Sequence, residues 1–441
     1  MRQWMVAAKK ADFYAIAEKF HVDPVVARII RNREVIGEKN IRIYLGGNLS
    51  DLSDPHQMKD MDRLVEILAQ KIRKQVHIRI IGDYDVDGVT SSHLFLTALR
   101  RVGAKVDVVI PHRIQDGYGL SLHLLQQAKE DGVDTILTCD NGIAAIDEIA
   151  WAKAQKMTVL VTDHHAVPFE EHEGRRTEKK SLADAVVNPH QQDCGYPYKE
   201  LCGAGVAWNV IRVLYENYDM DKREAEDLLD FVAMATVCDV MSLTGENRIL
   251  VKEGLKRIRH TKNIGLQALM QACNVQPENI SAYHFGYVLG PCVNATGRLD
   301  TARHALRLFE TGQETEAEEI ARDLVDLNQE RKEFTLQGVE MAKKLCEEGG
   351  YENDPVLVLF LPDVHESIAG LIAGRIREMY NRPVFVLTRG EEEVKGSGRS
   401  TENYSMYENM CGCAELFTKF GGHPMAAGLS LSLIHISEPT R

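Results

Sequence analysis

The feature that most constrains the fold of this chain is a regular alternation of short apolar runs and helical stretches between residues 76 and 188. Each apolar run is bounded by turn or breaker residues, which predicts a β-strand. The five runs are VHIRIIGD, AKVDVVIP, VDTILTCD, MTVLVTD and ADAVVNP. Helical segments such as VTSSHLFLTALRRVG and SLHLLQQAKEDG separate them. Strands and helices that alternate at this spacing predict a doubly wound, mostly parallel α/β sheet.

The rest of the chain predicts a helical region, a long helix and a second, smaller α/β unit. Residues 202–272 have a helical pattern throughout. The charged stretch over 314–347 carries apolar residues at helical spacing, and as one helix it would reach about 50 Å. Two shorter surface helices are the alternative. After it, PVLVLFLPD, a helix over 366–380 and PVFVLTRG predict a second βαβ unit, followed by the glycine-rich segments KGSGRS and FGGHPMAAGLS.

Length and composition exclude several classes of protein. The chain has 441 residues, of which 44% are hydrophobic and 27% charged, so we expect a folded protein of two or three domains. No run approaches the roughly 20 apolar residues of a membrane-spanning helix, and the first twenty residues predict an amphipathic helix rather than a signal peptide. The nine cysteines form no CxxC pair, which predicts reduced thiols in a cytoplasm. With a formal net charge of −13, a polyanionic substrate needs a local basic groove or bound cations.

The densest chemical signal is the sequence GDYDVDG, which follows the first predicted strand and contains Asp83, Asp85 and Asp87. Three carboxylates this close together repel one another unless a cation lies among them. A calcium-binding EF-hand loop begins in a similar way, but it needs a glutamate where this chain has Leu94. A solvated acidic turn is the remaining alternative for the motif taken alone.

Three further segments place acidic residues or histidines where strands or helices end. Asp140 ends ILTCD, Asp163 ends VLVTD ahead of His164 and His165, and Asp239 lies at the end of an apolar helical run. Because ligands collect beyond the carboxyl ends of parallel strands, we expect these groups to meet on one rim. We expect Asp140, at a strand end, to lie outside the hydrophobic core. Carboxylates with one or two imidazoles suit Mn²⁺ or Mg²⁺, and two such ions about 3.5–4 Å apart would clamp a phosphate for in-line attack.

Adjacent histidines point to opposite sides of a regular strand, so only a sharp turn lets both His164 and His165 reach one site. The alternative is one metal ligand and one packed or surface histidine. We expect the other histidines, including His77, His93 and His260, to be surface or core residues.

Taken together, GDYDVDG, TCDNG, TDHH and the later CD at Asp239 resemble the four motifs of the DHH phosphoesterase superfamily. KGSGRS and GGHPMAAG resemble the substrate-binding motifs of its DHH-associated second domain. The N-terminal helical extension, CGAGVAWNV and VNATGRLDTARHAL resemble the RecJ family of exonucleases more than the smaller members of the superfamily. The resemblance extends from about residue 70 to residue 430.

The resemblance implies a role for each matching residue of the first domain. It implies that five residues bind two divalent metal ions: Asp85, Asp87, Asp140, His164 and Asp239. Asp140 would be the ligand that both ions share. Of the remaining catalytic residues, Asp83 would be a further ligand or a neighbour of the ligands, and His165 would lie near the scissile phosphate. Asp163 would orient a histidine.

In the second domain, the resemblance implies that Arg399 and His423 hold the part of the substrate that is not transferred. The accompanying substrate-binding residues are Ser397, Gly398, Gly421 and Gly422, near which backbone N–H groups would approach phosphate. Ordinary tight turns are the alternative for these glycine-rich segments. Arg298, Arg303 and Arg375 are further candidates for phosphate contacts, with surface ion pairs as the alternative.

The resemblance implies a hydrolase that degrades single-stranded DNA from its 5′ end with Mn²⁺ or Mg²⁺, in DNA repair and recombination. It implies a cytoplasmic monomer without membrane attachment, with a single-strand-binding protein and a helicase as partners. Within the superfamily, the alternatives are an oligoribonuclease, a nucleotide phosphatase and a cyclic-dinucleotide phosphodiesterase. Those smaller members usually carry a histidine where this chain has Ile81. An inactive replication scaffold would lack metal ligands, and none is missing here.

The expected domain order combines these patterns. We predict an N-terminal helical extension over 1–70, a DHH catalytic domain over 71–310, a connecting helix over 311–349 and a DHH-associated substrate-binding domain over 350–430. The segment 431–441 back-translates into a string that resembles a sequencing-library adapter, so we interpret it as read-through. RecJ-like chains continue into closing strands and an OB-fold domain that grips single strands. We therefore expect weak binding of long strands and an incompletely paired sheet edge.

Overall fold

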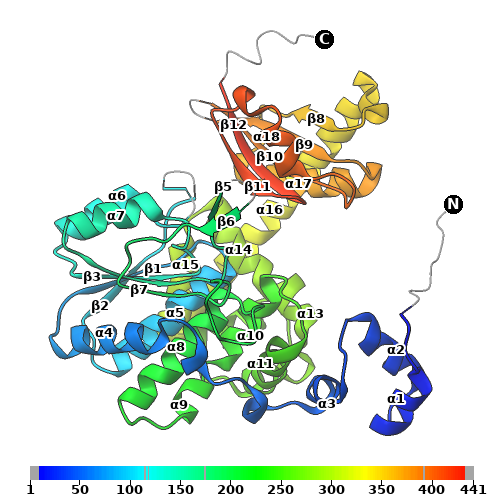
Figure 1. Ribbon diagram of the computed structural model, residues 1–441. Helices are drawn as coiled ribbons and strands as arrows, with labels where there is room; N and C mark the ends of the chain where they lie inside the picture. Colours follow the sequence, from blue (N-terminus) through cyan, green and yellow to red (C-terminus); the bar gives the residue numbers. More distant parts are fainter. Residues whose placement is uncertain (1–8, 114–115, 118, 173–174, 391–392, 433–441) are drawn as a thin grey trace. The chain divides into compact units, whose positions relative to one another are not determined.

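The structure is a computed structural model that describes residues 9–113, 116–117, 119–172, 175–390 and 393–432. The chain, drawn as a ribbon in Figure 1, forms two compact units, Met1–Val325 and Asp326–Arg441. Each unit has its own hydrophobic core. The first unit holds the strand–helix alternation of residues 76–188, and the second holds the smaller α/β unit that the sequence predicts.

Five parallel strands form the central sheet of the first unit, in the order β2-β1-β3-β4-β7. They are β1 (Ile78–Ile81), β2 (Val106–Val109), β3 (Thr135–Cys139), β4 (Thr158–Thr162) and β7 (Ala185–Val187). All five predicted strands are present. The direction of winding reverses between β1 and β3, which makes the sheet doubly wound and confirms the predicted fold class.

Helices lie on both faces of this sheet (Figure 1). On one face are α4 (Met61–Arg73), α5 (Val86–Arg101) and α8 (Gly203–Asn217), and on the other are α6 (Leu122–Glu130) and α7 (Ile146–Ala154). Successive residues of a strand point to opposite faces of the sheet, so they belong to different hydrophobic cores. Ile80 packs with the first set of helices and Ile81 with the second. Since both faces are covered, a ligand of this sheet can approach only at the strand ends.

A helical region follows the sheet, as the sequence predicts from residue 202 onward. After α8 it comprises α9 (Arg223–Glu226), α10 (Leu229–Cys238), α11 (Gly245–Arg257), α12 (Ile264–Ala272), α13 (Ala282–His284), α14 (Gly290–Leu299) and α15 (Ala302–Glu310). A π-helical turn, η5 (Phe285–Leu289), joins α13 to α14. Shorter 3-10 turns are η1 (Leu49–Asp51), η2 (Pro55–Gln57), η3 (Ile258–His260) and η4 (Pro277–Asn279). Because α10 ends at Cys238, this region supplies Asp239, an acidic residue that no strand carries.

The N-terminal helices are α1 (Phe13–Phe20), α2 (Pro24–Asn32) and α3 (Glu38–Gly46). The predicted helix over the first twenty residues is wrong for residues 9–12. There, Asp12 caps α1 by accepting a hydrogen bond from the Ala15 N–H at 2.9 Å, so the helix begins only at Phe13. Residues 1–8 of that predicted helix lie outside the described residues.

One continuous helix, α16 (Glu314–Gly349), confirms the predicted long helix and excludes the alternative of two shorter ones. Its first half, including Leu324, belongs to the core of the first unit, and its second half, including Val339, belongs to the core of the second. Packing requires Gly338, because a Cβ there would collide with Ile372. Although α16 is long, none of the described helices combines the length and the apolar composition that would span a membrane.

The second unit contains a five-stranded mixed sheet in the order β11-β12-β10-β9-β8. Its strands are β8 (Leu357–Phe360), β9 (Val384–Arg389), β10 (Val394–Arg399), β11 (Lys419–His423) and β12 (Ala426–Leu431). β8 and β9 are parallel and are joined through α17 (Glu366–Tyr380), which confirms the second βαβ unit. The other pairs are antiparallel. Further short elements are α18 (Met406–Cys411), η6 (Tyr351–Asn353) and η7 (Ala414–Leu416).

Two segments complete the comparison with the predicted elements. The antiparallel hairpin of β5 (Phe169–His172) and β6 (Arg175–Glu178) was not predicted, because its polar and charged sequence shows no apolar alternation. Of the segment 431–441, which we interpret as read-through, only Leu431 and Ser432 lie within the described residues.

Candidate metal centre and substrate-binding face

The turn after β1 places the first acidic motif at the carboxyl end of the central sheet. Asp85 is the N-cap of α5, and its Oδ1 accepts a hydrogen bond from the Gly88 N–H at 3.1 Å. Asp83 and Asp87, on either side of it, are 2% and 1% exposed. A Cβ at Gly88 would collide with the Asp83 backbone, so glycine is needed for the helix to begin this close to the strand. The motif therefore buries carboxylates directly at the end of β1.

The N-terminus of α8 holds Asp87 in place. The N–H groups of Gly203 and Ala204 donate hydrogen bonds to the two carboxylate oxygens of Asp87, at 2.6 and 2.8 Å. A helix N-terminus attracts negative charge because its first N–H groups have no partner within the helix. The same turn approaches Asp140 closely, since a Cβ at Gly203 would lie 2.6 Å from the Asp140 Cβ. The start of α8 thus fixes the positions of two aspartates.

Asp140 lies directly after β3, where the backbone has a φ of 61°. This left-handed conformation is uncommon for a residue other than glycine, and such conformations concentrate at functional sites. Asn141 stabilises the turn by donating from its side-chain amide to the carbonyls of Ile81 and Cys139, at 3.0 and 2.9 Å. The expectation that Asp140 lies outside the core is wrong: only 2% of it is exposed, because α8 covers it.

His164 faces three aspartates that come from separate parts of the chain. Its Nε2 atom lies 3.1 Å from Asp140 Oδ1, 3.6 Å from Asp239 Oδ2 and 3.7 Å from Asp87 Oδ2. The histidine itself is 9% exposed. The end of β3, the end of α10 and the start of α5 therefore meet at the imidazole that follows β4.

Asp163 forms the turn that brings both histidines to the same place. Its Oδ2 accepts from the Ile143 N–H at 2.9 Å, and its Oδ1 accepts from the N–H groups of His164 and His165 at 2.7 and 3.0 Å. The ring Nδ1 of His165 lies 2.8 Å from Asp163 Oδ1 and 3.9 Å from Asp140 Oδ1. The two imidazole rings are 4.4 Å apart between centroids. The sharp turn that the sequence requires is present, so neither histidine lies apart from the site.

Seven side chains form what we call the acidic cluster, in three overlapping groups. The groups are Asp83, Asp85 and Asp140; Asp87, His164 and Asp239; and Asp140, His164 and His165. Within each group the candidate ligand atoms all lie within 4.8 Å of one another. Because Asp140 and His164 each belong to two groups, the arrangement is compatible with two neighbouring ions that share ligands.

Burial and mutual repulsion raise the pKa values of Asp83, Asp140 and Asp239 in the acidic cluster. Burial, followed by the charge of Asp85, raises the pKa of Asp83 well above its usual range. Burial, followed by the charge of Asp87, does the same to the pKa of Asp140. For Asp239, burial and then the charges of Asp87 and Asp85 raise the pKa to about 8. The charged forms of these carboxylates therefore need a compensating positive charge.

The two histidines differ in their preferred charge state. Burial lowers the pKa of His164 below its ordinary value. Burial also disfavours the charged form of His165, but the hydrogen bond to Asp163 and the surrounding carboxylates outweigh it and raise its pKa to about 9. A neutral imidazole is the form that binds metal, whereas an imidazolium is suited to bind phosphate.

The acidic cluster fits divalent cations. Asp83 Oδ1, Asp239 Oδ2 and His164 Nε2 are buried, and no hydrogen bond satisfies them. A buried polar atom without a partner costs about 1–3 kcal/mol. Carboxylate oxygens and imidazole nitrogens are ligands that Mn²⁺ accepts, and oxygens are the ligands that Mg²⁺ prefers. A bound cation would satisfy these atoms and offset the repulsion among the carboxylates.

Two residues near the first acidic motif were not predicted from the sequence. The guanidinium of Arg113 lies over the ring of Tyr84, 4.8 Å from its centroid. Asn294 on α14 accepts a hydrogen bond from the Val86 N–H at 3.1 Å. The segment VNATGRLD, which contains Asn294, resembles the RecJ family in sequence. The positions of Arg113 and Asn294 in the sequence nevertheless do not indicate that either residue lies near the acidic motif.

The three arginines that are further candidates for phosphate contacts differ in their exposure and in their surroundings. Arg298 is half-buried on α14, where the adjacent Gly297 packs so closely on the Tyr84 carbonyl that a Cβ would collide. Arg303 is exposed on α15. Arg375 is exposed on α17, and its guanidinium lies 3.7 Å from the Glu378 carboxylate, which is the surface ion pair of the alternative interpretation. Of the three, Arg298 lies beside the acidic motif.

Strand register aligns the predicted substrate-binding residues of the second unit. Arg399 on β10 pairs with Ala426 on β12, which pairs in turn with His423 on β11. Ser397 lies two residues before Arg399 and therefore faces the same side of the sheet. We call Ser397, Arg399 and His423 the sheet face.

Glycines keep the sheet face open. Nothing lies within 4 Å of the position that a Cβ of Gly421 would occupy, and Gly422 has a φ of 153°. The Arg399 side chain extends over α17, because a Cβ at Gly370 would lie 2.9 Å from its Nη2. Gly421, Gly422 and His423 are all exposed. A ligand can therefore approach the backbone of β11 directly.

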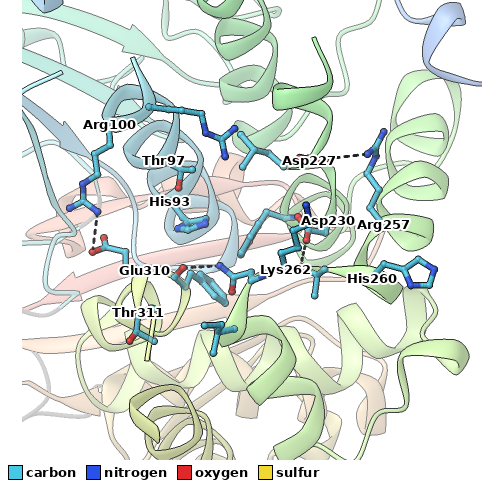
Figure 2. A pocket seen from close by; sticks show the side chains of 18 of the residues that line it. His93, Thr97, Arg100, Asp227, Asp230, Arg257, His260, Lys262, Glu310 and Thr311 are labelled. Carbon is cyan, nitrogen blue, oxygen red and sulfur yellow. Dashed lines mark hydrogen bonds and ion pairs between the residues drawn. The ribbon is translucent and has the colours of Figure 1, made fainter. Parts of the chain in front are cut away.

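A separate cavity of about 1020 Å³ lies among the helices of the first unit (Figure 2). His93, predicted as a surface or core residue, is buried at this cavity. Charged side chains that line the cavity form ion pairs with one another: Arg100 lies 3.8 Å from Glu310, and Arg257 lies 3.6 Å from Asp227. The cavity is lined by the end of α5, whereas the acidic motif lies at the start of that helix, so the two sites are distinct.

Two family models match this chain. The model of the DHH family, N-terminal domain, matches residues 77–236, and the model of the DHHA1 domain matches residues 353–438. The acidic cluster draws most of its residues from the first of these segments, and the sheet face lies within the second.

Individual proteins are also similar to this chain. The single-stranded-DNA-specific exonuclease RecJ of Haemophilus influenzae is 35% identical over 433 residues, which cover 94% of this chain and 73% of that protein. A crystal structure of exonuclease RecJ bound to manganese matches with a TM-score of 0.74 and 31% identity, over 86% of this chain and 92% of that one. RecJ of Thermus thermophilus in complex with Mg²⁺ matches with a TM-score of 0.73 and 28% identity, over 95% of this chain and 56% of that one.

Proposed function

Because the chain belongs to the RecJ family of DHH phosphoesterases, we propose that it is a metal-dependent exonuclease that degrades single-stranded DNA from the 5′ end. The resemblance predicted from the four motifs is confirmed by the relatives and by the two family models. The reaction is hydrolysis of phosphodiester bonds, and its setting is DNA repair and recombination.

The observation that carries this proposal is the convergence of the acidic cluster from distant parts of the chain. Its carboxylates and imidazoles follow β1, β3, β4 and α10, and all of them meet at one rim. Burying like charges without compensation destabilises a fold. A scaffold that binds partners without hydrolysis gains nothing from such a cluster, whereas a two-metal hydrolase requires it.

We assign the metal ligands as Asp85, Asp87, Asp140, His164 and Asp239. Asp140 is the ligand shared between the two sites, since it has candidate partners on both sides of the cluster. When bound, two Mn²⁺ or Mg²⁺ ions supply the charge that polarises the scissile phosphate and acidifies a water molecule for attack. Asp87 retains free lone pairs on its oxygens for this role although α8 already donates to both of them.

His165 and Asp163 act as a pair in this proposal. Asp163 fixes the orientation of the His165 ring through their contact at 2.8 Å. The positively charged His165 stabilises the charge that develops on the phosphate. Asp83, buried beside Asp85 and Asp140, is a further ligand or holds the ligands in place.

The substrate-binding residues of the proposal lie in both units. In the second unit, the sheet face and the neighbouring Gly398, Gly421 and Gly422 bind the part of the strand that is not transferred. In the first unit, Arg113 and Arg298 lie beside Tyr84 and are assigned to phosphate groups. The exposed Arg303 and Arg375, of which Arg375 lies 3.7 Å from the Glu378 carboxylate, are further candidates for phosphate contacts.

We place the protein in the cytoplasm as a monomer, with a single-strand-binding protein and a helicase as partners. The nine cysteines form no CxxC pair, and this sequence pattern favours reduced thiols in a cytoplasm. The two partners follow from the proposed reaction, since a strand must be unwound and kept single before it is degraded.

The test is degradation of a 5′-labelled single strand by the purified chain with Mn²⁺, with Mg²⁺ and with EDTA. We expect products only with a metal, released from the 5′ end. A duplex, a ribonucleotide dinucleotide and a cyclic dinucleotide serve as competing substrates. If the dinucleotides were hydrolysed faster than the single strand, an oligoribonuclease or a phosphodiesterase would be the better assignment, and no metal-dependent product at all would favour the scaffold.

A further inference from the structure

Two tyrosines form an exposed aromatic pair on the first unit. Tyr283 and Tyr287 are 62% and 73% exposed. Their rings are stacked, with centroids 5.2 Å apart and an angle of 24° between the planes. Two large aromatic rings that stack on each other in solvent leave wide faces uncovered. Such faces are the type of surface on which nucleic-acid bases stack.

The local backbone explains why the rings are presented outward. They come from α13 and from the π-helical turn η5, which continue into α14 as one helical rod. Pro291 near the start of α14 has no N–H, and its ring would clash with the carbonyl of Tyr287 four residues earlier in a regular α-helix. The rod therefore widens, and the Gly290 N–H donates to Phe285 five residues back. π-helical turns of this kind are frequent at functional sites.

This rod is attached to the acidic cluster at two points. Near the tyrosines, the Cys238 Sγ donates to the Phe285 carbonyl at 3.3 Å, and Cys238 directly precedes Asp239. Farther along the rod, Asn294 accepts from the Val86 N–H at 3.1 Å, next to Asp85. Since a helix rises about 1.5 Å per residue, Tyr287 and Asn294 are about 10 Å apart along the axis. A strand with one phosphate at the cluster would thus reach the tyrosines with a nearby base.

The residue after Asp239 adds to this surface. Val240 has a φ of 58° and is 88% exposed. A β-branched residue is strained in this left-handed conformation, and strain of this kind persists where the surrounding structure imposes it. The turn holds Val240 in this state through hydrogen bonds from the N–H groups of Val240 and Met241 to Val237 and Thr236, both at 3.2 Å. An apolar side chain is therefore displayed at the end of α10, where η5 is attached.

We propose that Tyr283 and Tyr287 form a stacking site for the bases of a single strand whose phosphate lies at the acidic cluster. This inference rests on the proposed function. The site takes any nucleobase, because every base has a flat aromatic face, and so it adds affinity without sequence preference. It complements the charged contacts of Arg113 and Arg298, which bind phosphates rather than bases.

The experiment compares Tyr287→Ala, Tyr283→Ala and Tyr287→Phe with the unmodified chain. The matched control is Tyr14→Ala, because Tyr14 is 77% exposed on α1. For a strand of about twelve nucleotides, we expect each alanine variant to raise KM roughly tenfold with little change in kcat. Tyr287→Phe keeps the ring and should behave like the unmodified chain, as should Tyr14→Ala. A mononucleotide ester, which cannot reach the tyrosines, should be hydrolysed equally by all variants.

A second measurement needs no substitution. A strand that contains 5-iodouracil is mixed with the unmodified chain and Mn²⁺ and irradiated with a flash that is brief compared with hydrolysis, and mass spectrometry then identifies the attached peptide. We expect the attachment at Tyr283 or Tyr287. Unchanged KM in both alanine variants, equal losses in Tyr287→Phe and Tyr287→Ala, or attachment only elsewhere would each overturn the stacking site. If the unmodified chain hydrolysed nothing but still attached at these tyrosines, the proposed function would fail while the stacking site stood.

Discussion

The acidic cluster and the sheet face are built in opposite ways. The acidic cluster is mostly buried, and its residues come from segments as distant as Asp83 and Asp239. The sheet face lies on β10 and β11, which β12 joins in simple antiparallel register. His423 on that face is exposed, and Gly421 beside it leaves open space.

Because of this difference, substitutions in the two regions should have different consequences. Buried carboxylates depend on one another, on the N–H groups that hold them and on a compensating cation, so a small displacement disturbs all of them. The side chains of the sheet face are half-buried or exposed, so their loss changes little except the binding of a charged ligand. We therefore expect changes in the acidic cluster to alter metal binding and catalysis, and changes in the sheet face to alter substrate binding alone.

The largest expected effect is that of Asp140→Asn, which keeps the shape of the side chain and removes its charge. We expect hydrolysis to fall at least about a thousandfold, because the ligand shared by both metal sites is lost. Single-turnover kinetics and calorimetric titration with Mn²⁺ measure the two consequences. Asp193→Asn is the control, since Asp193 forms an exposed ion pair with Lys59 at 2.7 Å. Activity within about tenfold of the unmodified chain would contradict the shared role of Asp140.

The second prediction compares two glycines of α8. A Cβ in Gly203→Ala would lie 2.6 Å from the Asp140 Cβ, whereas in Gly205→Ala the nearest atom is 3.3 Å away, on the Leu201 side chain. We expect Gly203→Ala to displace Asp140 and to reduce kcat about a hundredfold, the usual effect of misplacing a reacting group by about 1 Å. Gly205→Ala should stay close to the unmodified chain. Equal activity of the two variants would show that the cluster tolerates displacement.

The third prediction concerns the contact between Asp163 and His165. In Asp163→Asn the His165 ring loses the carboxylate that orients it and stabilises its charge, so we expect activity to fall about 10- to 100-fold. Steady-state kinetics of Asp163→Asn, His165→Ala and the double variant measure this coupling. If the losses of the two single variants simply multiplied in the double variant, the residues would act independently, contrary to the proposal.

The smallest expected effect is that of Arg399 in the sheet face. In Arg399→Ala we expect KM for a single strand to rise about tenfold and the binding of Mn²⁺ to stay unchanged. Arg399→Lys should recover part of the loss, because it restores the charge without the planar guanidinium. Arg389→Ala, at an exposed position of β9, is the control. If Arg399→Ala no longer bound two ions, the claim that the sheet face affects substrate binding alone would be contradicted.

The central sheet was predictable because parallel strands covered on both faces are nearly continuous apolar runs. The same signal predicted the βαβ unit of the second domain. The β5–β6 hairpin lacks that signal, and the start of α1 depends on the cap at Asp12 rather than on periodicity. Local patterns thus predicted the elements that have a buried face, and they missed a polar hairpin and a helix boundary.

The rim of the acidic cluster was predictable for a related reason. Strand ends in a parallel sheet meet at one edge, so the acidic residues after β1, β3 and β4 were expected together. Nothing local pointed to Asn294, to Arg113 or to the N–H groups of Gly203 and Ala204. The individual roles that we assign to the ligands remain predictions, to be tested by the substitutions above.

The sequence alone determined the order of strands and helices and the family of this protein, because periodicity and short motifs are local properties of the chain. Only the tertiary structure decided that Asp140 is buried under α8 with a left-handed backbone, and that Asp87 receives two N–H groups. Asp87 and Gly203 are 116 residues apart in the chain. A contact across such a separation depends on how whole helices pack on the sheet, and the residues near either end carry no sign of it.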